Sequence, residues 1–500
     1  MMAEVNHPIP PGRGSFKHTA AQLHSELQIK ELISDSRLVK PGDTFVAYQG
    51  DKLDGREYIA DALERGAQSI IWDPKGFVWP DKWQHIAHRP VAHLKENISE
   101  LASVIYNSPS QHMSVIGVTG TNGKSTCSQW LTQLLTKKEG SCGLMGTLGN
   151  GIWPELAESL NTTLDAIECQ KWLNHFVQAQ CKNCVMEVSS HGLVQGRVSG
   201  ISFTGAIFTN LTRDHLDYHG TMEAYAEAKA LLFQAKGLQW AVINIDDAFG
   251  QTLVERYRNT IPVVLGYSLK PSENEEILSA SNIRLNLQGI SFDLAYQGKI
   301  TEVKAPILGR FNVANLLAVL GALNCLGMDI KEAITSLDAL QFPKGRLEKL
   351  SSTNAPSVVI DYAHTPDALE QVLLTLREIV PQNGKLICVF GCGGNRDTGK
   401  RSLMGRVADR LADQIIITND NPRHEDPLAI AMTIRQAIEQ QADIILDRRQ
   451  AIESALKHAS SNDVILIAGK GHENYQEVQG SRYVFSDHDV VSAWYQRRGQ

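Results

Sequence analysis

The chain has 500 residues, of which 43% are hydrophobic and 21% are charged, and its formal net charge is -7 at pH 7. This composition is typical of a globular protein, and at roughly 150 residues per domain the length indicates about three domains. The negative charge argues against a dominant nucleic-acid-binding surface, and the lack of an apolar run of about 18 residues argues against a membrane span.

The N-terminal stretch Met1 to Gly14 is polar, contains Pro and Gly, and lacks the apolar core of a signal peptide. We therefore expect a disordered extension over residues 1–15. The eight cysteines are scattered, and Cys181 and Cys184 form the one close pair, which supplies too few ligands for a typical zinc site. Reduced thiols in a cytoplasmic enzyme are the expected state.

Three segments follow one another along the chain, and each predicts a domain. Residues 1–111 contain the strand-like run Thr44–Tyr48 and end in the linker-like run Tyr106–Gln111. Residues 112–342 alternate strand-like and helix-like runs, which indicates a mostly parallel sheet covered by helices. The strands expected there are Met113–Val118, Asn183–Met186, Gly205–Thr209 and Ala241–Ile245, and the helices are Ser125–Lys137 and Thr221–Gln234.

Residues 343–500 repeat the alternation and predict a second doubly wound, Rossmann-like domain. Its expected strands are Val358–Ile360, Lys385–Phe390, Gln414–Thr418 and Asp463–Ala468. The fold class predicted for the whole chain is therefore α/β, in three domains.

The run Thr119-Gly-Thr-Asn-Gly-Lys-Ser125 lies between an expected strand and an expected helix. A glycine-rich turn at a helix N-terminus directs several backbone N–H groups toward one point, where they bind phosphate. Lys124 adds a positive charge and Ser125 offers a hydroxyl to a metal ion. The spacing is not that of a strict Walker A motif, because five residues separate Gly117 from Gly123. The sequence predicts a nucleoside triphosphate site.

Polar side chains also follow other expected strands, where ligand groups of open α/β sheets collect. Glu187 precedes Val-Ser-Ser-His191, and Asn210 begins a run that ends Asp214-His-Leu-Asp217. Glu187 and Ser125 offer the hard oxygen atoms that Mg²⁺ prefers. Lys229 lies in a helix-like run, and its spacing alone favours a solvated lysine.

Four polar clusters end expected strands of the third segment: Asp361–Asp367, Gly391–Arg401, Asp420–Arg423 and Gly469–Glu473. Arginines among them can bind carboxylates through two parallel hydrogen bonds, and acids among them can receive an ammonium group. These residue types predict a site for a ligand that carries charges of both signs.

Taken together, these motifs closely resemble the Mur ligases, the ATP-dependent amide ligases that build the peptidoglycan stem peptide. The resemblance runs from about Ile33 to Asp489 and is carried by Thr119–Lys124, Glu187–His191, Asn210–Asp217, Gly309–Asn315, Gly345-Arg346 and Asp361–His364. It implies a UDP-binding N-terminal α/β domain, a central P-loop-type ATPase domain and a Rossmann-like C-terminal domain.

Within the family, Asp35-Ser-Arg37, the His364–Asp367 run and Asp420–Arg423 look like the members that add the third residue of the stem peptide. The activity implied is transfer of meso-2,6-diaminopimelate to the D-Glu of UDP-N-acetylmuramoyl-L-Ala-D-Glu through an acyl phosphate. The resemblance places that reaction in cytoplasmic precursor synthesis, and hence in cell-wall biogenesis, cell shape and cell division. A monomer that binds neither nucleic acid nor membrane is expected.

The resemblance also implies roles for single residues. ATP contacts are expected from Gly120, Thr121, Asn122, Gly123, Lys124, Ser125, Thr126, Asn312, Asn315, Arg346, Asp361 and His364. Contacts to the UDP-muramoyl-dipeptide are expected from Ser34, Ser36, Asn161, Thr162, Thr163, Ser189, Gln195 and Arg197. Diaminopimelate contacts are expected from Arg396, Asp420, Asn421, Pro422, Arg423, Gly469 and Glu473.

Two Mg²⁺ ions are implied, with Ser125, Glu187, His215 and Lys229 as their ligands and with Lys124 also in the catalytic set. Lys229 matches the lysine that the family carbamylates with CO₂, a change that converts a cation into a carboxylate-like anion suited to a hard metal. This overrides the solvated lysine that spacing alone favours.

Diaminopimelate differs from lysine by a carboxylate beside the distal amine, and Arg423 with Arg396 would hold that carboxylate. Asp420 and Glu473 would hold the ammonium. Asn395 stands where the family usually has aspartate, a departure that could change how Arg396 is oriented. The alternatives are an L-lysine-adding ligase, another Mur or folylpolyglutamate-type ligase, a non-catalytic homologue, and a simple P-loop ATPase or kinase.

Overall fold

The computed structural model describes residues 13–50, 53–159, 161–235, 237–286, 289–342, 345–352 and 354–498. These residues form two compact units. The first unit contains residues up to 117, 135–205 and 231–238, and the second contains 118–134, 206–230 and 239 onward. The expected disordered extension falls largely on residues 1–12, outside the described residues. Residues 13–15 of that stretch are helical, because Arg13 begins helix α1 (Arg13–Leu27).

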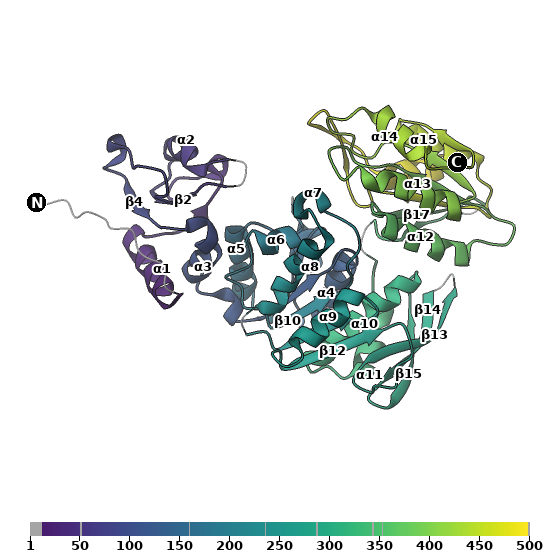
Figure 1. Ribbon diagram of the computed structural model, residues 1–500, viewed down its shortest axis with the longest axis horizontal. Coiled ribbons are helices and arrows are strands. Elements are labelled where there is room, and N and C mark those ends of the chain that lie inside the picture. The colour runs from purple at the N-terminus through teal and green to yellow at the C-terminus, as the bar shows by residue number, and fades with distance from the viewer. Residues whose placement is uncertain are drawn as a thin grey trace, which may run out of the picture. The chain divides into compact units, whose positions relative to one another are not determined.

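The first unit opens with a four-stranded sheet in which every strand runs parallel to its neighbour (Figure 1). Its strands, in spatial order, are β1 (Leu32–Ile33), β2 (Thr44–Ala47), β3 (Ser69–Trp72) and β4 (Ala87–Pro90). Helices α1, α2 (Ile59–Glu64) and α3 (Leu94–Ile105) belong to the same part of the chain. The predicted strand Thr44–Tyr48 is confirmed to within one residue.

A second set of strands in the first unit positions the acidic residue Glu187. Its spatial order is β9 (Asn183–Glu187), β6 (Gly143–Gly146), β7 (Gly149–Ile152) and β8 (Glu155–Ala157), with β9 and β6 parallel and the others antiparallel. Helices α5 (Ala166–Gln178) and α6 (Ser190–Val194) flank β9 in the sequence.

The chain passes from the first unit into the second along β5 (Ser114–Thr119) and returns along α4 (Lys124–Glu139). In the second unit, β10 (Gly205–Phe208), β11 (Trp240–Asn244), β12 (Val263–Ser268), β13 (Leu278–Asn286), β14 (Gly289–Tyr296) and β15 (Lys299–Ala305) lie side by side in chain order. The helices interspersed with these strands are α7 (Leu216–His219), α8 (Met222–Ala230), α9 (Ala248–Tyr257), α10 (Arg310–Cys325) and α11 (Ile330–Thr335).

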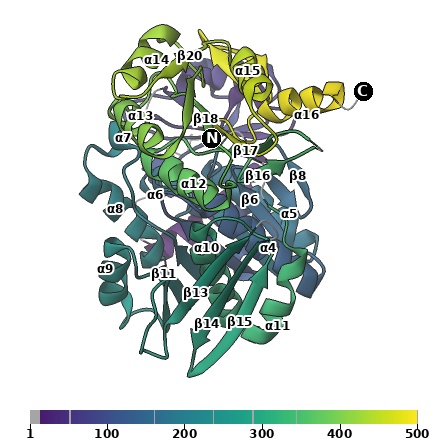
Figure 2. The same ribbon diagram turned by 90° about the vertical axis from the view of Figure 1, so that its right-hand side faces the viewer.

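The last three of these strands are antiparallel, which the sequence did not predict for this mostly parallel domain (Figure 2). A tight hairpin joins β14 to β15 through Gln297 and Gly298, whose φ angles are 50° and 70°. Two consecutive residues with positive φ make the turn that fits the twist of a two-residue hairpin. The Gln297-Gly298 pair, with its glycine, was the signal in the sequence that could have revealed this turn.

The third part of the chain forms a six-stranded sheet in the second unit. Its spatial order is β16 (Glu348–Leu350), β17 (Ser357–Asp361), β21 (Val464–Ala468), β18 (Leu386–Phe390), β19 (Gln414–Ile417) and β20 (Ala442–Ile444), and only β16 is antiparallel to its neighbour. The helices of this part are α12 (Pro366–Ile379), α13 (Gly399–Leu411), α14 (Pro427–Arg435), α15 (Arg448–His458) and α16 (Asp487–Arg498), and a separate hairpin consists of β22 (Tyr475–Val478) and β23 (Ser481–Val484).

Two apolar cores lie on opposite faces of this sheet because its strands alternate their side chains. One core contains Cys388 and Leu466 with residues of α12, α13 and α14. The other contains Ile387 and Ile465 with residues of α15 and α16. Strands β17, β18, β19 and β21 are largely buried and read as apolar runs, and the sequence located these four to within one residue. It did not predict the short, partly exposed strands β16 and β20. The predicted α/β class is confirmed.

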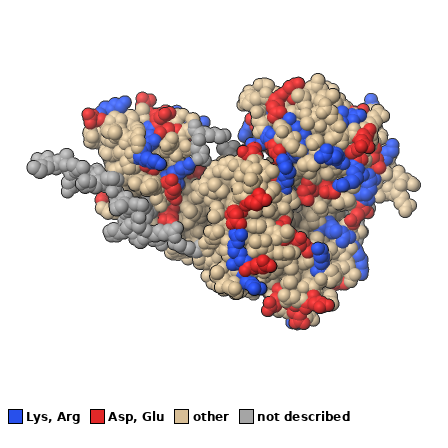
Figure 3. All heavy atoms as spheres, viewed as in Figure 1, with Lys and Arg blue, Asp and Glu red and all other residues tan. Residues whose placement is uncertain are grey.

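Charged residues of both signs are interspersed on the face drawn in Figure 3. Among the described residues, no helix combines the length and apolar character needed to cross a membrane.

One buried ion pair joins α15 to the start of α16. Arg448 donates to Asp487 through Nε and Nη2, both at 2.8 Å, and both side chains are 0% exposed. Arg448 also donates to the carbonyl oxygens of Ala468 at 3.0 Å and Asn419 at 3.2 Å. Burial opposes the charged form of Arg448, but the Asp487 carboxylate outweighs it and raises the pKa of the guanidinium.

We expect Asp487→Asn to destabilise the protein by about 3–5 kcal/mol, because it leaves a buried guanidinium without its counter-charge. The free energy of unfolding, measured by urea denaturation, tests this. Glu453→Gln is the control, since it breaks the exposed pair with Arg497 at 3.1 Å and should cost at most about 1 kcal/mol. Equal losses in the two variants would contradict the prediction.

Candidate active site

The glycine-rich turn after β5 is held against the segment that follows β10. Thr121 N donates to Asn210 O at 2.8 Å, Asn122 N donates to Asn210 Oδ1 at 2.9 Å, and Thr209 Oγ1 donates to Asn122 O at 2.5 Å. Thr212 N donates to Thr121 Oγ1 at 3.0 Å. Two strand ends thus fix the turn, as expected where parallel strands finish at one edge of a sheet.

Glycine is required at both glycine positions of this turn. Gly120 and Gly123 have φ angles of 150° and 85°, which lie in the region that favours glycine. A Cβ on Gly120 would overlap Thr209 Oγ1, and a Cβ on Gly123 would lie 2.5 Å from Asn315 Oδ1. Because Gly120 and Gly123 have no side chains, a ligand can approach the backbone of the turn closely at these two positions.

Lys124 begins α4, and its Nζ donates to Gly120 O at 2.8 Å and to Thr121 O at 2.9 Å. Ser125 and Thr126 follow it and are buried. Asn315 Oδ1 accepts from Cys127 Sγ at 3.5 Å, and Asn315 Nδ2 donates to Asn312 Oδ1 at 2.9 Å. The predicted residues Asn312 and Asn315 therefore lie directly behind the turn.

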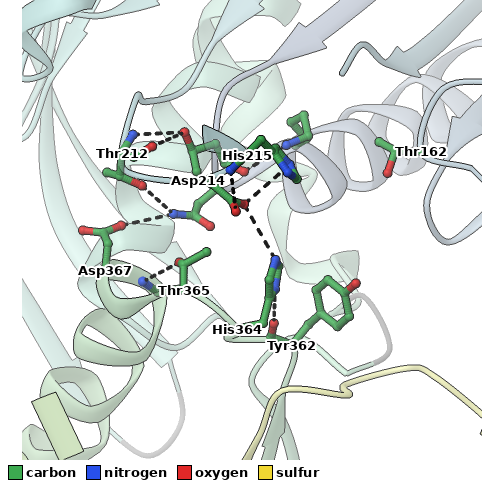
Figure 4. Close-up of polar contacts among 12 residues, drawn as sticks. Thr162, Thr212, Asp214, His215, Tyr362, His364, Thr365 and Asp367 are labelled. Atoms are coloured by element: carbon green, nitrogen blue, oxygen red, sulfur yellow. Dashed lines mark hydrogen bonds and ion pairs between the residues drawn. The ribbon is translucent and has the colours of Figure 1, made fainter. Parts of the chain in front are cut away.

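A polar cluster lies on the other side of Thr121 and includes His215 and His364 (Figure 4). The buried Asp214 carboxylate lies 3.5 Å from His215 Nε2 and 3.9 Å from His364 Nε2. Burial raises the pKa of Asp214, its Coulombic interactions with His364, His215 and Lys400 lower it, and the net shift is downward. Burial, aided by Lys400, lowers the pKa of His364, so this imidazole is neutral at pH 7.

Asn122 also belongs to this cluster, because its side chain reaches helix α12. Asn122 Nδ2 donates to Asp367 Oδ2 at 3.1 Å, and burial raises the pKa of that carboxyl group. Asp367 ends the His364–Asp367 run that contributes to the family resemblance, but no role was predicted for it. Asp214 and Asp367 are the two acids of this cluster that the predicted site residues omitted.

Lys229 on α8 is 1% exposed, so the solvated lysine favoured by spacing alone is wrong. Its Nζ lies 4.2 Å from the centre of the Tyr225 ring, and the Tyr225 hydroxyl lies 3.2 Å from Thr121 Oγ1. Burial and the nearby Lys124 charge lower the pKa of Lys229 well below its usual value, while Asp214 opposes them. Burial of this kind shifts an amine toward its neutral, nucleophilic form.

Arg346 and Asp361 surround Tyr362 in the third part of the chain. The Arg346 guanidinium lies 4.6 Å from the centre of the Tyr362 ring, and that ring lies 4.7 Å from the His364 ring. Asp361 accepts from the backbone of Leu347 and Ala363, both at 2.7 Å. Burial raises the pKa of Asp361, and Arg346 and the two N–H groups act against it.

In the first unit, a network of hydrogen bonds that includes Glu187 connects most of the residues expected to contact the dipeptide substrate. Thr147 donates to Glu187 through its N–H at 2.9 Å and its hydroxyl at 3.1 Å. The Thr147 and Thr162 hydroxyls lie 3.0 Å apart, and Thr163 Oγ1 donates to Glu187 O at 3.0 Å.

The expected residues on either side of α6 join the same network. Ser189 N donates to Thr163 Oγ1 at 2.9 Å, Arg197 donates to Thr163 O at 2.6 Å, and Arg197 Nε donates to Gln195 Oε1 at 2.9 Å. Asn161 is exposed just before Thr162. Ser34 and Ser36 lie apart from this network, after β1 of the four-stranded sheet.

The residues expected to bind diaminopimelate meet around Asn421. Its Nδ2 donates to Glu473 Oε2 at 2.9 Å, and the fully buried Lys470 donates to Asn421 Oδ1 at 3.0 Å and to Glu473 Oε2 at 2.7 Å. Asn421 N donates to Asp420 Oδ1 at 2.6 Å, and Gly469, with φ 114°, passes beside Asp420 Oδ2. Lys470 was missed because nothing in its sequence distinguishes it from a surface lysine.

Arg423 follows Pro422 and has a φ angle of 51°, a backbone conformation that residues other than Gly and Asn seldom adopt. Its Nη1 donates to Gly394 O at 2.9 Å, and its Nε lies 3.2 Å from Glu477 Oε2. Arg396 is exposed on the loop after β18. Asn395 Oδ1 accepts from His424 N at 3.1 Å, a bond that an aspartate oxygen would accept equally, so the departure from the family residue preserves this contact.

Among the described residues, no group of three or more His, Cys, Asp or Glu side chains is arranged to hold a metal ion. The expected metal ligands fit Mg²⁺ by donor type where they carry oxygen, namely Ser125 and Glu187. An unmodified Lys229 does not fit. The eight cysteines are free thiols, as expected.

These features define an α/β protein with a phosphate-binding turn and a separate cluster of paired charges. Residues 118–323 match the Mur ligase middle domain, residues 345–471 the Mur ligase glutamate ligase domain, and residues 28–106 the Mur ligase family catalytic domain. The chain belongs to the Mur ligase family.

One relative is the UDP-N-acetylmuramoyl-L-alanyl-D-glutamate–2,6-diaminopimelate ligase of Janthinobacterium sp. (strain Marseille), 46% identical over 92% of this chain and 92% of that protein. A solved structure of a ligase of the same name has a TM-score of 0.67, 37% identity, and coverage of 94% of this chain and 96% of that one. The MurF ligase of Thermotoga maritima in complex with ADP shares the fold, with a TM-score of 0.63, 19% identity, and coverage of 89% of this chain and 94% of that one.

We expect Gly123→Ala to weaken ATP binding by at least about tenfold, because a Cβ 2.5 Å from Asn315 Oδ1 forces the turn to move. Isothermal titration calorimetry with ATP and Mg²⁺ measures this. Gly140→Ala is the matched control, since Gly140 has φ 86° but meets nothing within 4 Å, and it should bind ATP normally. Unchanged ATP affinity in Gly123→Ala would contradict the prediction.

Proposed function

We propose that this protein uses ATP to join meso-2,6-diaminopimelate to the D-Glu side-chain carboxyl of UDP-N-acetylmuramoyl-L-Ala-D-Glu. The relatives that carry this activity in their names support the proposal over nearly the full chain. The observation that carries it is the Asp420–Arg423 loop, where a partly exposed arginine lies beside acids and amides that suit an amino acid. The reaction belongs to peptidoglycan precursor synthesis in the cytoplasm, and thus to cell-wall growth, cell shape and cell division.

The chemistry begins at the phosphate-binding turn. Thr121 N and Asn122 N donate to Asn210, so the other backbone N–H groups of Gly120–Ser125 and the Lys124 ammonium bind the ATP phosphates and stabilise negative charge that develops on them. The D-Glu carboxylate attacks the γ-phosphorus, ADP leaves, and an acyl phosphate forms. The diaminopimelate amine then attacks the carbonyl carbon, and inorganic phosphate departs from a tetrahedral intermediate. Positioning of the three substrates supplies much of the rate, so no protein nucleophile is needed.

Two Mg²⁺ ions would be held by Ser125, Glu187, His215 and carbamylated Lys229, and they would neutralise charge on the crowded phosphate oxygens. The environment of Lys229 supports the carbamate. Carbamylation needs an unprotonated amine to attack CO₂, and burial together with Lys124 lowers the pKa of Lys229 in that direction. The resulting anion would lie near the positive charge of Lys124.

The remaining predicted residues divide among the substrates. Asn312, Asn315, Arg346, Asp361 and His364 would contact adenine, ribose and phosphate. The network of Thr162, Thr163, Ser189, Gln195 and Arg197, with Asn161, would contact the dipeptide, and Ser34 and Ser36 the uridine. Arg396, Asp420, Asn421, Pro422, Arg423, Gly469 and Glu473 would contact diaminopimelate. We also propose domains at residues 1–111, 112–342 and 343–500, and a monomeric protein.

Phosphate release from ATP should require both UDP-N-acetylmuramoyl-L-Ala-D-Glu and meso-diaminopimelate, with L-lysine and L-ornithine as poor substitutes. A site built to pair a polar group rejects an analogue that lacks it by up to about 10⁴-fold, because its own group stays unpaired. Arg423→Ala should therefore lose most of the preference for diaminopimelate over lysine. Lysine preference in the wild type would identify a lysine-adding ligase instead, and no release with any amine would indicate another substrate or a non-catalytic homologue.

Lys229→Ala should abolish ligation, and added short-chain carboxylates should partly restore it by replacing the carbamate oxygens. With ¹³C-bicarbonate, a carbamate ¹³C NMR signal should appear in the wild type and be absent from the variant. The signal should weaken as pH falls, because protonation removes the reactive amine. Lys182→Ala, which removes an exposed lysine paired with Glu139 at 2.7 Å, is the control. Full activity in Lys229→Ala would rule out the carbamate.

A further inference from the structure

The N-terminus of helix α13 lies against the segment that follows β10. Gly399 begins the helix, and its N–H donates to Asp397 Oδ1 at 2.9 Å. Asp397 Oδ2 lies 3.4 Å from Arg213 Nε, and a Cβ on Gly399 would lie 3.0 Å from Arg213 Nη2. Arg213 comes directly after Thr212, whose N–H donates to Thr121 Oγ1 at 3.0 Å. The N-terminus of α13 is therefore connected to the phosphate-binding turn through this segment.

Lys400, the second residue of α13, is a buried lysine without a partner. It is 8% exposed, and no hydrogen bond or ion pair joins its ammonium group to any residue in the described part of the chain. Its neighbour Arg401 is 5% exposed but is paired, because its Nη2 lies 2.8 Å from Glu425 Oε2. An ammonium group that is buried without a counter-charge destabilises a folded protein, so a position that keeps one indicates a functional role.

The charge of Lys400 acts on the cluster around Asp214. Burial raises the pKa of Asp214, and two neighbouring histidines and Lys400 lower it. Burial also lowers the pKa of His364, and Lys400 lowers it further. The Asp214 carboxylate lies 3.9 Å from His364 Nε2, and these two side chains are labelled in Figure 4. The Lys400 ammonium is therefore close to both groups, although it forms no ion pair with Asp214.

The surroundings of Lys400 favour an anion. The N-terminus of a helix carries a partial positive charge, and the N-cap residue Thr398 forms no hydrogen bond to the helix through its side chain. Arg213, which is 49% exposed, adds a charge that it shares with Asp397. Asp214 opposes an anion, and it already accepts a hydrogen bond from the backbone N–H that follows it, at 2.9 Å. An anion that reaches Lys400 gains a charge-assisted hydrogen bond without displacing an existing partner.

The proposed ligation produces an anion beside this place. The ATP phosphates would occupy the turn at Gly120–Ser125, and Thr121 in that turn is hydrogen-bonded to Thr212, two residues before Asp214. Transfer to the D-Glu carboxylate carries the phosphoryl group away from the ADP that stays on the turn. A second cation, outside the turn, would then be needed to stabilise the transferred group.

We propose that Lys400 is a catalytic residue that binds the phosphoryl group of the acyl phosphate. This role rests on the proposed function. The incoming amine forms a C–N bond at the carbonyl carbon, the C–O bond to phosphorus breaks, and its electron pair leaves with inorganic phosphate while the amine loses a proton to solvent. The Lys400 ammonium stabilises the negative charge that collects on the phosphate oxygens during this step.

The test compares the wild type with Lys400→Gln and Lys400→Met. Both substitutions should lower kcat for ligation by about 10²- to 10³-fold, the usual effect of removing one donor that stabilises charge in a transition state. Both should raise the Ki for inorganic phosphate as a product inhibitor by about 10- to 100-fold, because a charge-assisted hydrogen bond is lost. The KM for diaminopimelate and the Kd for ADP, the latter from isothermal titration calorimetry, should not change, because Lys400 contacts neither ligand.

Thermal melting separates this role from a structural one. Removal of an unpaired buried cation should leave the melting temperature of Lys400→Met unchanged or higher, whereas loss of a lysine that supports the fold would lower it. Lys457→Gln is the matched control, since it removes the charge of an exposed lysine on α15 and should change none of these quantities.

A kcat near that of the wild type, or an unchanged Ki for phosphate in both variants, would overturn the inference. A lower kcat that comes with weaker ADP binding and a lower melting temperature would overturn it too, since Lys400 would then only support the structure. Failure of the wild type to ligate diaminopimelate would overturn the proposed function itself. Normal ligation by the wild type together with unaffected variants would overturn only the role of Lys400.

Discussion

The contact between the glycine-rich turn and the end of β10 is the constraint on which the proposed nucleotide site depends. Thr209 and Asn210 bind the backbone of Asn122 from one side, and Asn315 lies against Gly123 from the other. No side chain fits at Gly120 or Gly123 without displacing these neighbours. Contacts within the protein that hold the turn reduce the ordering that phosphate binding would have to supply. The Thr121 hydroxyl is hydrogen-bonded to the Tyr225 hydroxyl, and the Tyr225 ring contacts Lys229, so the turn is connected to Lys229 through Tyr225.

Three buried cations show how surroundings decide what a positive side chain does. Arg448 donates to both carboxylate oxygens of Asp487 through Nε and Nη2, and its role is structural. Lys470 meets Glu473 and Asn421, and it orders a proposed binding site. Lys229 faces an aromatic ring and is repelled by Lys124, so burial shifts it toward the neutral amine. A charge that is costly to bury is stabilised by a partner or shifted toward its neutral form, and Lys229 is the case in which burial and Lys124 favour the neutral form.

Local pattern predicted the elements with strong local signals. The buried strands β9, β10, β18 and β21 read as apolar runs, and the turn at Gly120–Gly123 could be recognised because its function dictates its sequence. Features set by tertiary contacts could not be predicted. Burial of Lys229 depends on what covers α8, and spacing alone pointed the opposite way. Lys470 contacts Asn421, Asp214 approaches His364 and Glu477 approaches Arg423 only because separate segments of the chain meet. The antiparallel pairing of β14 with β15 had a single two-residue turn as its signal in the sequence.

Recognition of diaminopimelate poses a problem that a lone arginine does not solve. Arg423 can reject lysine, because lysine leaves the guanidinium without a carboxylate, but it gives no reason to prefer a ligand that also carries an ammonium. An isolated guanidinium would also accept many other carboxylates. Arg423 is not isolated, because Glu477 lies 3.2 Å from it and pairs with Arg482 across the hairpin. Backbone hydrogen bonds join this hairpin to Asn421 and Arg423 and so fix the distance between Arg423 and Glu477.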